Sequence, residues 1–176
     1  AHFDQRMHEE VAAAARYDRP MSLIMMDVDK FKNLNDNHGH QAGDAALVAV
    51  AEILRGDGDS RQGDIVGRLG GDEFIVIIND IKDSDVVIEI STKIIYQLQR
   101  EFQVHKNKLY ISTSIGISLY PDDAISSEEL LRNSDTAMYK AKDGGKNSYQ
   151  FYTEEMTQKA FEHILMESNL RHALEH

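Results

Sequence analysis

Apolar residues recur at two different spacings along the chain, and each spacing predicts one kind of element. Near the start, Phe3, Met7, Val11 and Ala14 lie three or four residues apart, which predicts an amphipathic helix over residues 1–17. Similar stripes and helix-start signals recur in later segments. The helices predicted from them cover residues 42–54, 83–102, 126–142 and 154–176, and the polar segment 30–40 predicts one or two further helical turns.

Other apolar segments follow the pattern of strands. Residues 22–26 form a continuous apolar run, which is typical of a central strand buried on both faces. Apolar and polar residues alternate strictly over 109–120, which predicts a strand with one buried face, and residues 148–152 predict a short edge strand. With a hairpin between the helices, this order predicts an α+β fold in which helices flank a mostly antiparallel central sheet.

The hairpin carries the first candidate chemistry. Two apolar runs, 65–69 and 74–78, flank a Gly-Gly pair, and glycine takes the positive φ that a tight two-residue turn needs. Asp72 and Glu73 follow at once, where the chain should enter a buried strand. Burying carboxylates costs free energy unless something compensates their charge, which a divalent cation would do. The alternative is a solvated hairpin tip.

A third carboxylate, Asp27, ends the buried run 22–26. If that strand neighbours the hairpin, Asp27 converges with Asp72 and Glu73 at one edge of the sheet. Oxygen ligands of this kind suit Mg²⁺ or Mn²⁺. Paired carboxylates that hold a divalent metal are the requirement for phosphoryl or nucleotidyl transfer.

Composition limits the partners of such a site. The chain has 176 residues, 41% of them hydrophobic, which is enough for one domain with a proper core. A net charge of −11 argues against binding nucleic acid through a general basic field. Phosphate groups would instead need metal ions and local lysines, for which Lys32, Lys142 and Lys146 are candidates, although each alone could be a solvated surface charge.

The setting follows from what the sequence lacks. It contains no cysteine, which excludes a disulfide framework, a thiolate zinc site and a cysteine nucleophile. No apolar stretch approaches the length of a membrane span, and no signal peptide is visible. We therefore expect a cytoplasmic protein without membrane contact of its own.

Three blocks of sequence resemble one known family. Gly70-Gly71-Asp72-Glu73-Phe74 is similar to the signature of the GGDEF family of diguanylate cyclases, and residues 27–44 and 139–147 resemble two further blocks of that family. The match runs in register over about residues 1–152. It implies a palm-like nucleotidyl cyclase fold. It also implies condensation of two GTP into cyclic di-GMP and two pyrophosphate, by metal-assisted attack of each 3′-hydroxyl on the other GTP's α-phosphate.

The resemblance assigns roles at the carboxylates. Asp27, Asp72, Glu73 and the backbone carbonyl of Val28 take the metal-binding positions. Asp72 also takes the position of the proton acceptor for the attacking 3′-hydroxyl, so Asp72 and Glu73 are the candidate catalytic residues.

The resemblance also implies a set of substrate-binding residues: Phe31, Lys32, Asn35, His40, Asp44, Lys142 and Lys146. Asn35 and Asp44 match the pair that recognises guanine, since a carboxylate accepts from the N1 and N2 donors and an amide serves the acceptor side. Helix capping is the alternative for Asp44, and an ordinary loop position is the alternative for His40. The three lysines would hold the triphosphate, and Lys146 brings a point charge where the family commonly has arginine.

Residues 61–64 match the Arg-x-x-Asp inhibitory site of the family. Arg61 can donate to guanine O6 and N7, and Asp64 can accept from N1 and N2, so the resemblance implies product inhibition by cyclic di-GMP. A loop ion pair is the alternative interpretation.

The tail over residues 154–176 resembles the connector to a downstream EAL phosphodiesterase domain. We therefore expect a GGDEF domain over residues 1–153 and a helical connector after it, in a fragment of a GGDEF–EAL protein whose last residues derive from a vector. The Asp-x-Leu-Thr block that usually precedes the first helix in the family is absent.

The product implies a partner, because each chain offers one set of metal carboxylates and one guanine-recognising pair. Two chains must therefore face each other as a homodimer, and without sustained heptads we expect this pairing to be transient. Two alternatives remain: a module that binds GTP or cyclic di-GMP and regulates an attached phosphodiesterase without catalysis, and a plain interaction domain.

Overall fold

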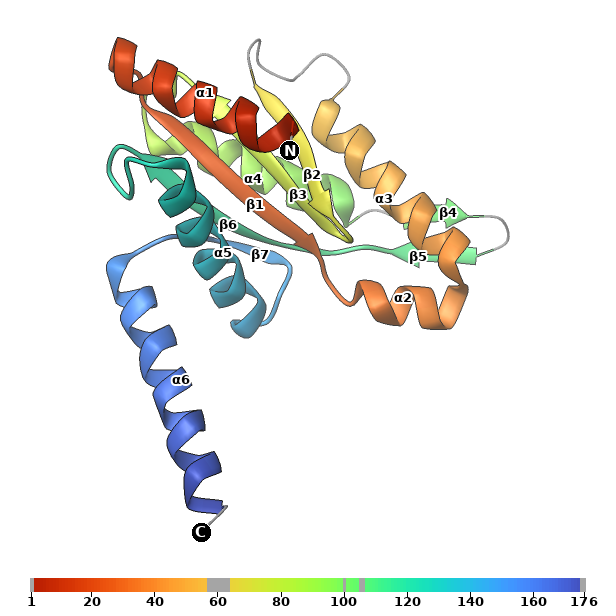
Figure 1. The fold of residues 1–176 in the computed structure, drawn as a ribbon. Helices are drawn as coiled ribbons and strands as arrows, with labels where there is room; N and C mark the ends of the chain where they lie inside the picture. The colour runs from red at the N-terminus through yellow and green to blue at the C-terminus, as the bar shows by residue number, and fades with distance from the viewer. Residues whose placement is uncertain (1, 57–63, 100, 105–106, 175–176) are drawn as a thin grey trace.

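The structure is a computed structural model that describes residues 2–56, 64–99, 101–104 and 107–174. Figure 1 shows one sheet with helices on both faces and a last helix that leads away from the body. The helices are α1 (His2–Tyr17), α2 (Phe31–His38), α3 (His40–Arg55), α4 (Ser84–Leu98), α5 (Ser127–Asp143) and α6 (Glu154–Leu174). The strands are β1 (Met21–Val28), β2 (Ile65–Gly70), β3 (Glu73–Asn79), β4 (Glu101–Val104), β5 (Asn107–Tyr110), β6 (Thr113–Tyr120) and β7 (Ser148–Phe151).

The main sheet has the strand order β2-β3-β1-β6-β7, and β4 with β5 forms a separate two-stranded sheet. All pairs in the main sheet are antiparallel except β6 with β7, which is parallel. The central strand β1 is buried along its whole length, as its continuous apolar run predicts. These features confirm the predicted α+β fold with a mostly antiparallel central sheet.

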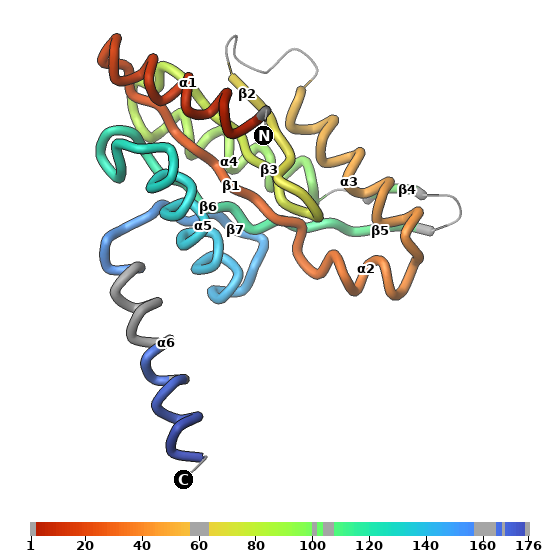
Figure 2. Tube along the Cα trace, in the orientation of Figure 1, coloured from red at the N-terminus to blue at the C-terminus, as the bar shows by residue number. Residues whose placement is uncertain are grey.

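Side chains of β1 alternate between two buried clusters on opposite faces of the sheet. Ile24 and Met26 pack with the apolar faces of α3 and α4. Leu23 and Met25 pack on the other face, with α1 and α5. Figure 2 shows the trace of this arrangement, with β1 running between the helical layers. Because β1 is packed on both faces, its last residues, Asp27 among them, are held in place.

The prediction of one half-buried strand over 109–120 is wrong. The segment divides into β5 and β6, and β6 is buried on both faces up to Ser118. Its alternation is one of large and small residues, because α5 packs on the small side: a Cβ on Gly116 would collide with the backbone of Ser134 and Met138. The Ser118 hydroxyl donates to the Leu130 carbonyl at 2.9 Å on the same side. The small polar residues of β6 therefore lie under a closely packed helix and do not face solvent.

The predicted helix over 83–102 is too long at its end. Helix α4 begins as expected, because the Asp83 carboxylate accepts from the Asp85 backbone N–H at 2.9 Å, but it ends at Leu98. Phe102 lies in β4 and still packs against the same core cluster. Phe102 therefore fits the helical spacing of apolar residues because it packs on the same core as α4, although the helix ends before it.

Two further predictions concern the end of the chain. The predicted start of the helix over 126–142 is confirmed, since α5 follows Ser126, whose hydroxyl accepts from the Glu129 backbone N–H at 3.2 Å. The tail forms helix α6, but Leu165 and Leu170 are exposed, so the body of the domain does not bury these two apolar residues. None of the described helices is both long and apolar enough to cross a membrane.

Candidate functional site

The predicted meeting of two strand ends is confirmed in the register of the sheet. Strands β1 and β3 pair antiparallel, and Asp27 lies directly opposite Glu73. One residue beyond, the Val28 backbone N–H donates to the Asp72 carbonyl at 3.2 Å. All three candidate carboxylates therefore lie at the same end of this strand pair.

The turn between β2 and β3 differs from its prediction by one residue. Gly70 ends β2 and pairs with Glu73, so Gly71 and Asp72 form the turn, with φ of +137° at Gly70 and +53° at Gly71. The Arg68 guanidinium donates to the Gly71 carbonyl at 3.0 and 2.6 Å and so fixes the turn. Asp72 is thus held in a braced turn and does not open the strand.

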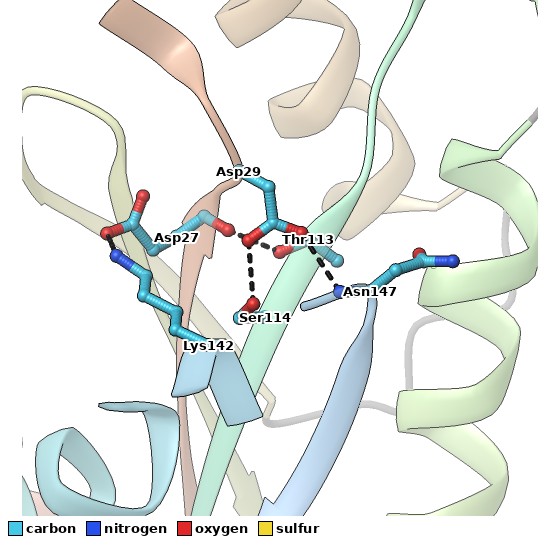
Figure 3. A network of polar contacts seen from close by, with 6 residues as sticks. All are labelled: Asp27, Asp29, Thr113, Ser114, Lys142 and Asn147. Carbon is cyan, nitrogen blue, oxygen red and sulfur yellow. Dashed lines mark hydrogen bonds and ion pairs between the residues drawn. The ribbon is translucent and has the colours of Figure 1, made fainter. Parts of the chain in front are cut away.

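Asp27 is the acid of the site whose pKa is shifted. It is 5% exposed, its Oδ2 contacts the Lys142 ammonium, and its Oδ1 is buried without a hydrogen-bond partner in the described structure. The pKa of Asp27 is raised to about 7, chiefly by burial and then by the neighbouring Asp72 carboxyl, against the opposing effect of Lys142. Figure 3 shows Lys142 reaching Asp27 from α5.

This arrangement fits a divalent cation. Two neighbouring carboxyls repel when both are ionised, and a cation between them would remove that repulsion and occupy the unpartnered Asp27 Oδ1. Glu73 does not complete a closer set, because no three His, Asp or Glu side chains among the described residues gather tightly enough to hold a metal. The Asp27–Asp72 pair is therefore the part of the predicted site that the fold brings together.

A second acid at the end of β1, Asp29, has the opposite surroundings (Figure 3). Its Oδ1 accepts from the Ser114 hydroxyl at 2.6 Å, and its Oδ2 accepts from the Ser112 hydroxyl at 2.7 Å and the Asn147 backbone N–H at 3.0 Å. Sequence reasoning assigned Asp29 no role of its own. The only signal was its place in the Asp-Val-Asp pattern, which does not distinguish it from Asp27.

The candidate guanine-binding residues lie where α2 meets α3. Asn35 has a buried Oδ1 with no partner among the described residues, and Phe31 is partly buried beside it. A Cβ on Gly43 would collide with the Asn35 amide and approach the Phe31 ring to 3.1 Å, so the absence of a side chain at Gly43 makes room for Asn35. Sequence reasoning missed Gly43, whose signal was a glycine inside a helix.

Asp44 lies one residue beyond Gly43 and is exposed. Helix α3 begins at His40 and has no acid in its first turn, so Asp44 lies too far along the helix to cap it. The capping alternative for Asp44 is therefore wrong, and a role for its carboxylate outside the helix stays a prediction.

The structure does not bring the remaining described candidate residues together with the carboxyl pair. Lys32, His40 and Lys146 are exposed, and Lys146 has a φ of +66°. Arg61 lies outside the described residues. Asp64 precedes β2, and its Oδ1 accepts from the Asn79 backbone N–H at 3.4 Å. The structure thus leaves the Arg61–Asp64 product site a prediction.

Sequence comparisons identify the family of this chain. Residues 1–148 match the family described as diguanylate cyclase, GGDEF domain. MucR of Pseudomonas aeruginosa, named a bifunctional diguanylate cyclase/cyclic di-GMP phosphodiesterase, is 39% identical over 98% of this chain and 25% of MucR. PdeR of Escherichia coli, named a cyclic di-GMP phosphodiesterase, is 35% identical over 88% of this chain and 23% of PdeR. The chain spans about a quarter of the length of these curated relatives.

Solved structures agree with the fold. The GGDEF domain of TpbB from Pseudomonas aeruginosa is 32% identical and superposes with a TM-score of 0.85 over 90% of this chain and 91% of that domain. The GGDEF domain of DgcB from Caulobacter crescentus, solved in complex with c-di-GMP, is 26% identical with a TM-score of 0.77 over 85% of this chain and 87% of that chain. The predicted resemblance is confirmed: the chain belongs to the diguanylate cyclase GGDEF-domain family.

Proposed function

We propose that this chain condenses two molecules of GTP into cyclic di-GMP and two pyrophosphate. The observation that carries the proposal is the Asp27–Asp72 carboxyl pair with one buried, unpartnered oxygen beside the Lys142 ammonium. This site suits a divalent cation and polyphosphate, and a protein of this net charge would attract neither nucleic acid nor free phosphate by its overall field. A cytoplasmic, GTP-containing setting is part of the proposal.

The chain's residues divide the work as follows. Asp27 and Asp72, with the Val28 carbonyl and Glu73, would hold Mg²⁺ or Mn²⁺. The bound metal would neutralise charge on the phosphates and lower the pKa of the attacking hydroxyl. Asp72 accepts the 3′-hydroxyl proton. The 3′-oxygen then forms a bond to the α-phosphorus of the other GTP, and the bond from that phosphorus to the bridging oxygen breaks, which releases pyrophosphate.

Substrate recognition falls to helices α2, α3 and α5. Asn35, beside Phe31, and Asp44 would read the guanine base, and His40 lies at the start of α3 on the same side. Lys142 can turn from Asp27 to the triphosphate because its side chain is 32% exposed. Lys32 and Lys146 would add charge to the outer phosphates. These roles rest on the family resemblance and on the placement of the residues.

Catalysis requires a second copy of the chain. One chain holds one GTP, so two must face each other with each 3′-hydroxyl directed at the other's α-phosphate. In a transient homodimer, specific activity should rise with protein concentration, and fusion to a coiled coil should raise it further through effective concentration. A specific activity independent of concentration, in a protein shown to be monomeric, would contradict this part of the proposal.

Product inhibition at Arg61 and Asp64 completes the proposal. Arg61→Ala should weaken cyclic di-GMP binding by about 1–3 kcal/mol, the cost of one bidentate contact to guanine, and leave GTP affinity unchanged. Calorimetry with both nucleotides separates the two effects. Equal binding of cyclic di-GMP by both proteins would reduce the motif to a loop ion pair.

One observation favours a second candidate function, that of a regulatory GTP- or cyclic di-GMP-binding module for an attached EAL phosphodiesterase. Several relatives carry the name cyclic di-GMP phosphodiesterase, and this chain corresponds to only a part of them. Helix α6 supports a boundary near residue 153, because it leads away from the body with Met166 and Leu174 exposed. In this proposal residues 1–153 are the GGDEF domain and 154–176 the connector.

The two candidates separate in one assay. The chain is incubated with GTP and Mg²⁺ and the nucleotides are resolved by chromatography. A cyclase yields cyclic di-GMP and two pyrophosphate for each cyclic di-GMP formed. The regulatory module instead binds GTP or cyclic di-GMP in calorimetry and yields no product at any protein concentration.

A further inference from the structure

We propose that Asp29 is a positioning residue: its carboxylate holds the backbone N–H of Asn147 and thereby fixes the 145–147 turn that presents Lys146 to the phosphates of GTP. The inference rests on the proposed function for its ligand. It assigns Asp29 a role different from that of Asp27, two residues earlier on the same strand.

The surroundings of Asp29 favour a role in holding neighbouring groups over a role as a further metal ligand. Both carboxylate oxygens accept hydrogen bonds, from Ser114 at 2.6 Å and from Ser112 and Asn147 at 2.7 and 3.0 Å. The Asp29 backbone N–H also donates to the Ser112 carbonyl at 2.9 Å. The hydroxyls of Ser112, just before β6, and of Ser114, in β6, therefore orient the Asp29 carboxylate. The third hydrogen bond that the carboxylate accepts comes from the Asn147 backbone N–H.

The turn that receives this bond is strained. Gly145, Lys146 and Asn147 have φ values of +119°, +66° and +48°, so two consecutive residues with side chains adopt the left-handed conformation. Such a conformation persists only where surrounding contacts fix it. The Lys146 backbone N–H donates to the Ala141 carbonyl at 3.0 Å, back to α5, whereas the Asn147 N–H donates to Asp29 and so ties the turn to the sheet.

The segment from Lys142 to Asn147 is thus held at both ends by acids at the end of β1. Lys142 contacts Asp27, and the Asn147 N–H donates to Asp29, as Figure 3 shows. Lys146 lies one residue from the second anchor. Loss of the Asp29 bond would release the strained turn at the residue next to Lys146, without changing the cation-binding pair itself.

The test uses Asp29→Ala, Asp29→Asn and the surface control Asp135→Ala, which removes the same charge from an exposed position of α5. Binding of a non-hydrolysable GTP analogue with Mg²⁺ is measured by calorimetry, and exchange of the Asn147 amide proton by NMR in the ligand-free protein. Asp29→Ala should weaken analogue binding about tenfold and expose the Asn147 amide. Asp135→Ala should change neither.

The isosteric variant Asp29→Asn shows whether Asp29 acts through its hydrogen bond to the turn or through its negative charge. The side-chain carbonyl that it introduces can still accept from Asn147 and Ser112, while the new amide donates to the Ser114 oxygen. This variant should therefore keep a protected Asn147 amide and bind the analogue within a few-fold of wild type. Because it keeps the shape of the side chain, it decides the question even if Asp29→Ala does not fold. Analogue binding by Asp29→Asn as weak as by Asp27→Asn would overturn the proposal.

A double variant tests the route through Lys146. In a Lys146→Met background, Asp29→Ala should weaken binding little further, whereas independent roles would make the two losses multiply. Multiplying losses would overturn the proposal. If the wild-type chain bound no GTP analogue at all, the proposed function would fail, and the exchange of the Asn147 amide in Asp29→Ala and Asp29→Asn would still decide whether Asp29 holds the turn.

Discussion

Asp27 and Asp29 are two residues apart at the end of the same strand, and their surroundings are opposite. Asp27 is buried against another carboxyl, with one oxygen unpartnered in the described structure and a raised pKa. Asp29 has hydrogen-bond donors on both oxygens. An acid that folding leaves unsatisfied is prepared for a ligand, whereas an acid that folding satisfies serves to hold other groups in place.

The largest expected difference between these two acids is in turnover. Asp27→Asn keeps the shape of the side chain but removes a charge from the cation-binding pair, so cyclic di-GMP formation should fall by at least roughly two orders of magnitude. Asp29→Asn, the matched control, should stay within a few-fold of wild type. Initial rates with GTP and Mg²⁺ measure both, and equal losses in the two variants would remove the distinction.

A smaller effect is expected at the other unsatisfied group, Asn35. Gly43→Ala should displace the Asn35 amide and raise the KM for GTP about tenfold or more, with an overpacking cost of about 1–3 kcal/mol in stability. Gly67→Ala is the matched control, because its new methyl group collides with the Phe3 ring, on helix α1. The control should lose stability and keep its KM, and a KM raised equally in both variants would show a general effect of overpacking.

A pH dependence of stability separates the acids in the absence of metal and nucleotide. The pKa of Asp27 is raised to about 7 from 3.8, so the folded chain binds a proton more tightly than the unfolded chain between these values. This group therefore lowers the free energy of unfolding as pH rises from about 4 to 7, by at most about 1.4 kcal/mol per pH unit. Denaturant unfolding over that range should show a contribution in wild type and Asp29→Asn that is absent from Asp27→Asn.

The positions of the acids in the fold could be predicted from the sequence better than their hydrogen bonds and pKa values. The buried run that ends in Asp27 and the Gly-Gly hairpin next to Asp72 predicted two carboxyls at one sheet edge on the condition that the two strands pair, which the register of β1 with β3 supplies. The pattern could not show that Gly71 and Asp72 form the turn, because the pairing of β2 with β3 shifts register between Arg68 and Gly70.

What could not be predicted depends on packing between distant segments. The three donors to Asp29 come from 83 to 118 residues away, and no local pattern announces them. Serines of β6 suggested an exposed face until helix α5 was placed on them, with Ser134 beside Ser118 at 2.6 Å. The sequence alone could not show that Gly43 makes room for Asn35, because this contact exists only once α2 packs against α3.

The central claim is that a divalent cation stabilises the fold through Asp27 and not through Asp29. Thermal unfolding tests it most directly, followed with increasing Mg²⁺ and then Mn²⁺ in wild type, Asp27→Asn and Asp29→Asn, with chelator as the zero point. A ligand that binds only the folded state raises the midpoint with its concentration. We predict a rise in wild type and Asp29→Asn and a flat response in Asp27→Asn. A rise of equal size in Asp27→Asn, or a flat response in Asp29→Asn alone, would contradict the claim.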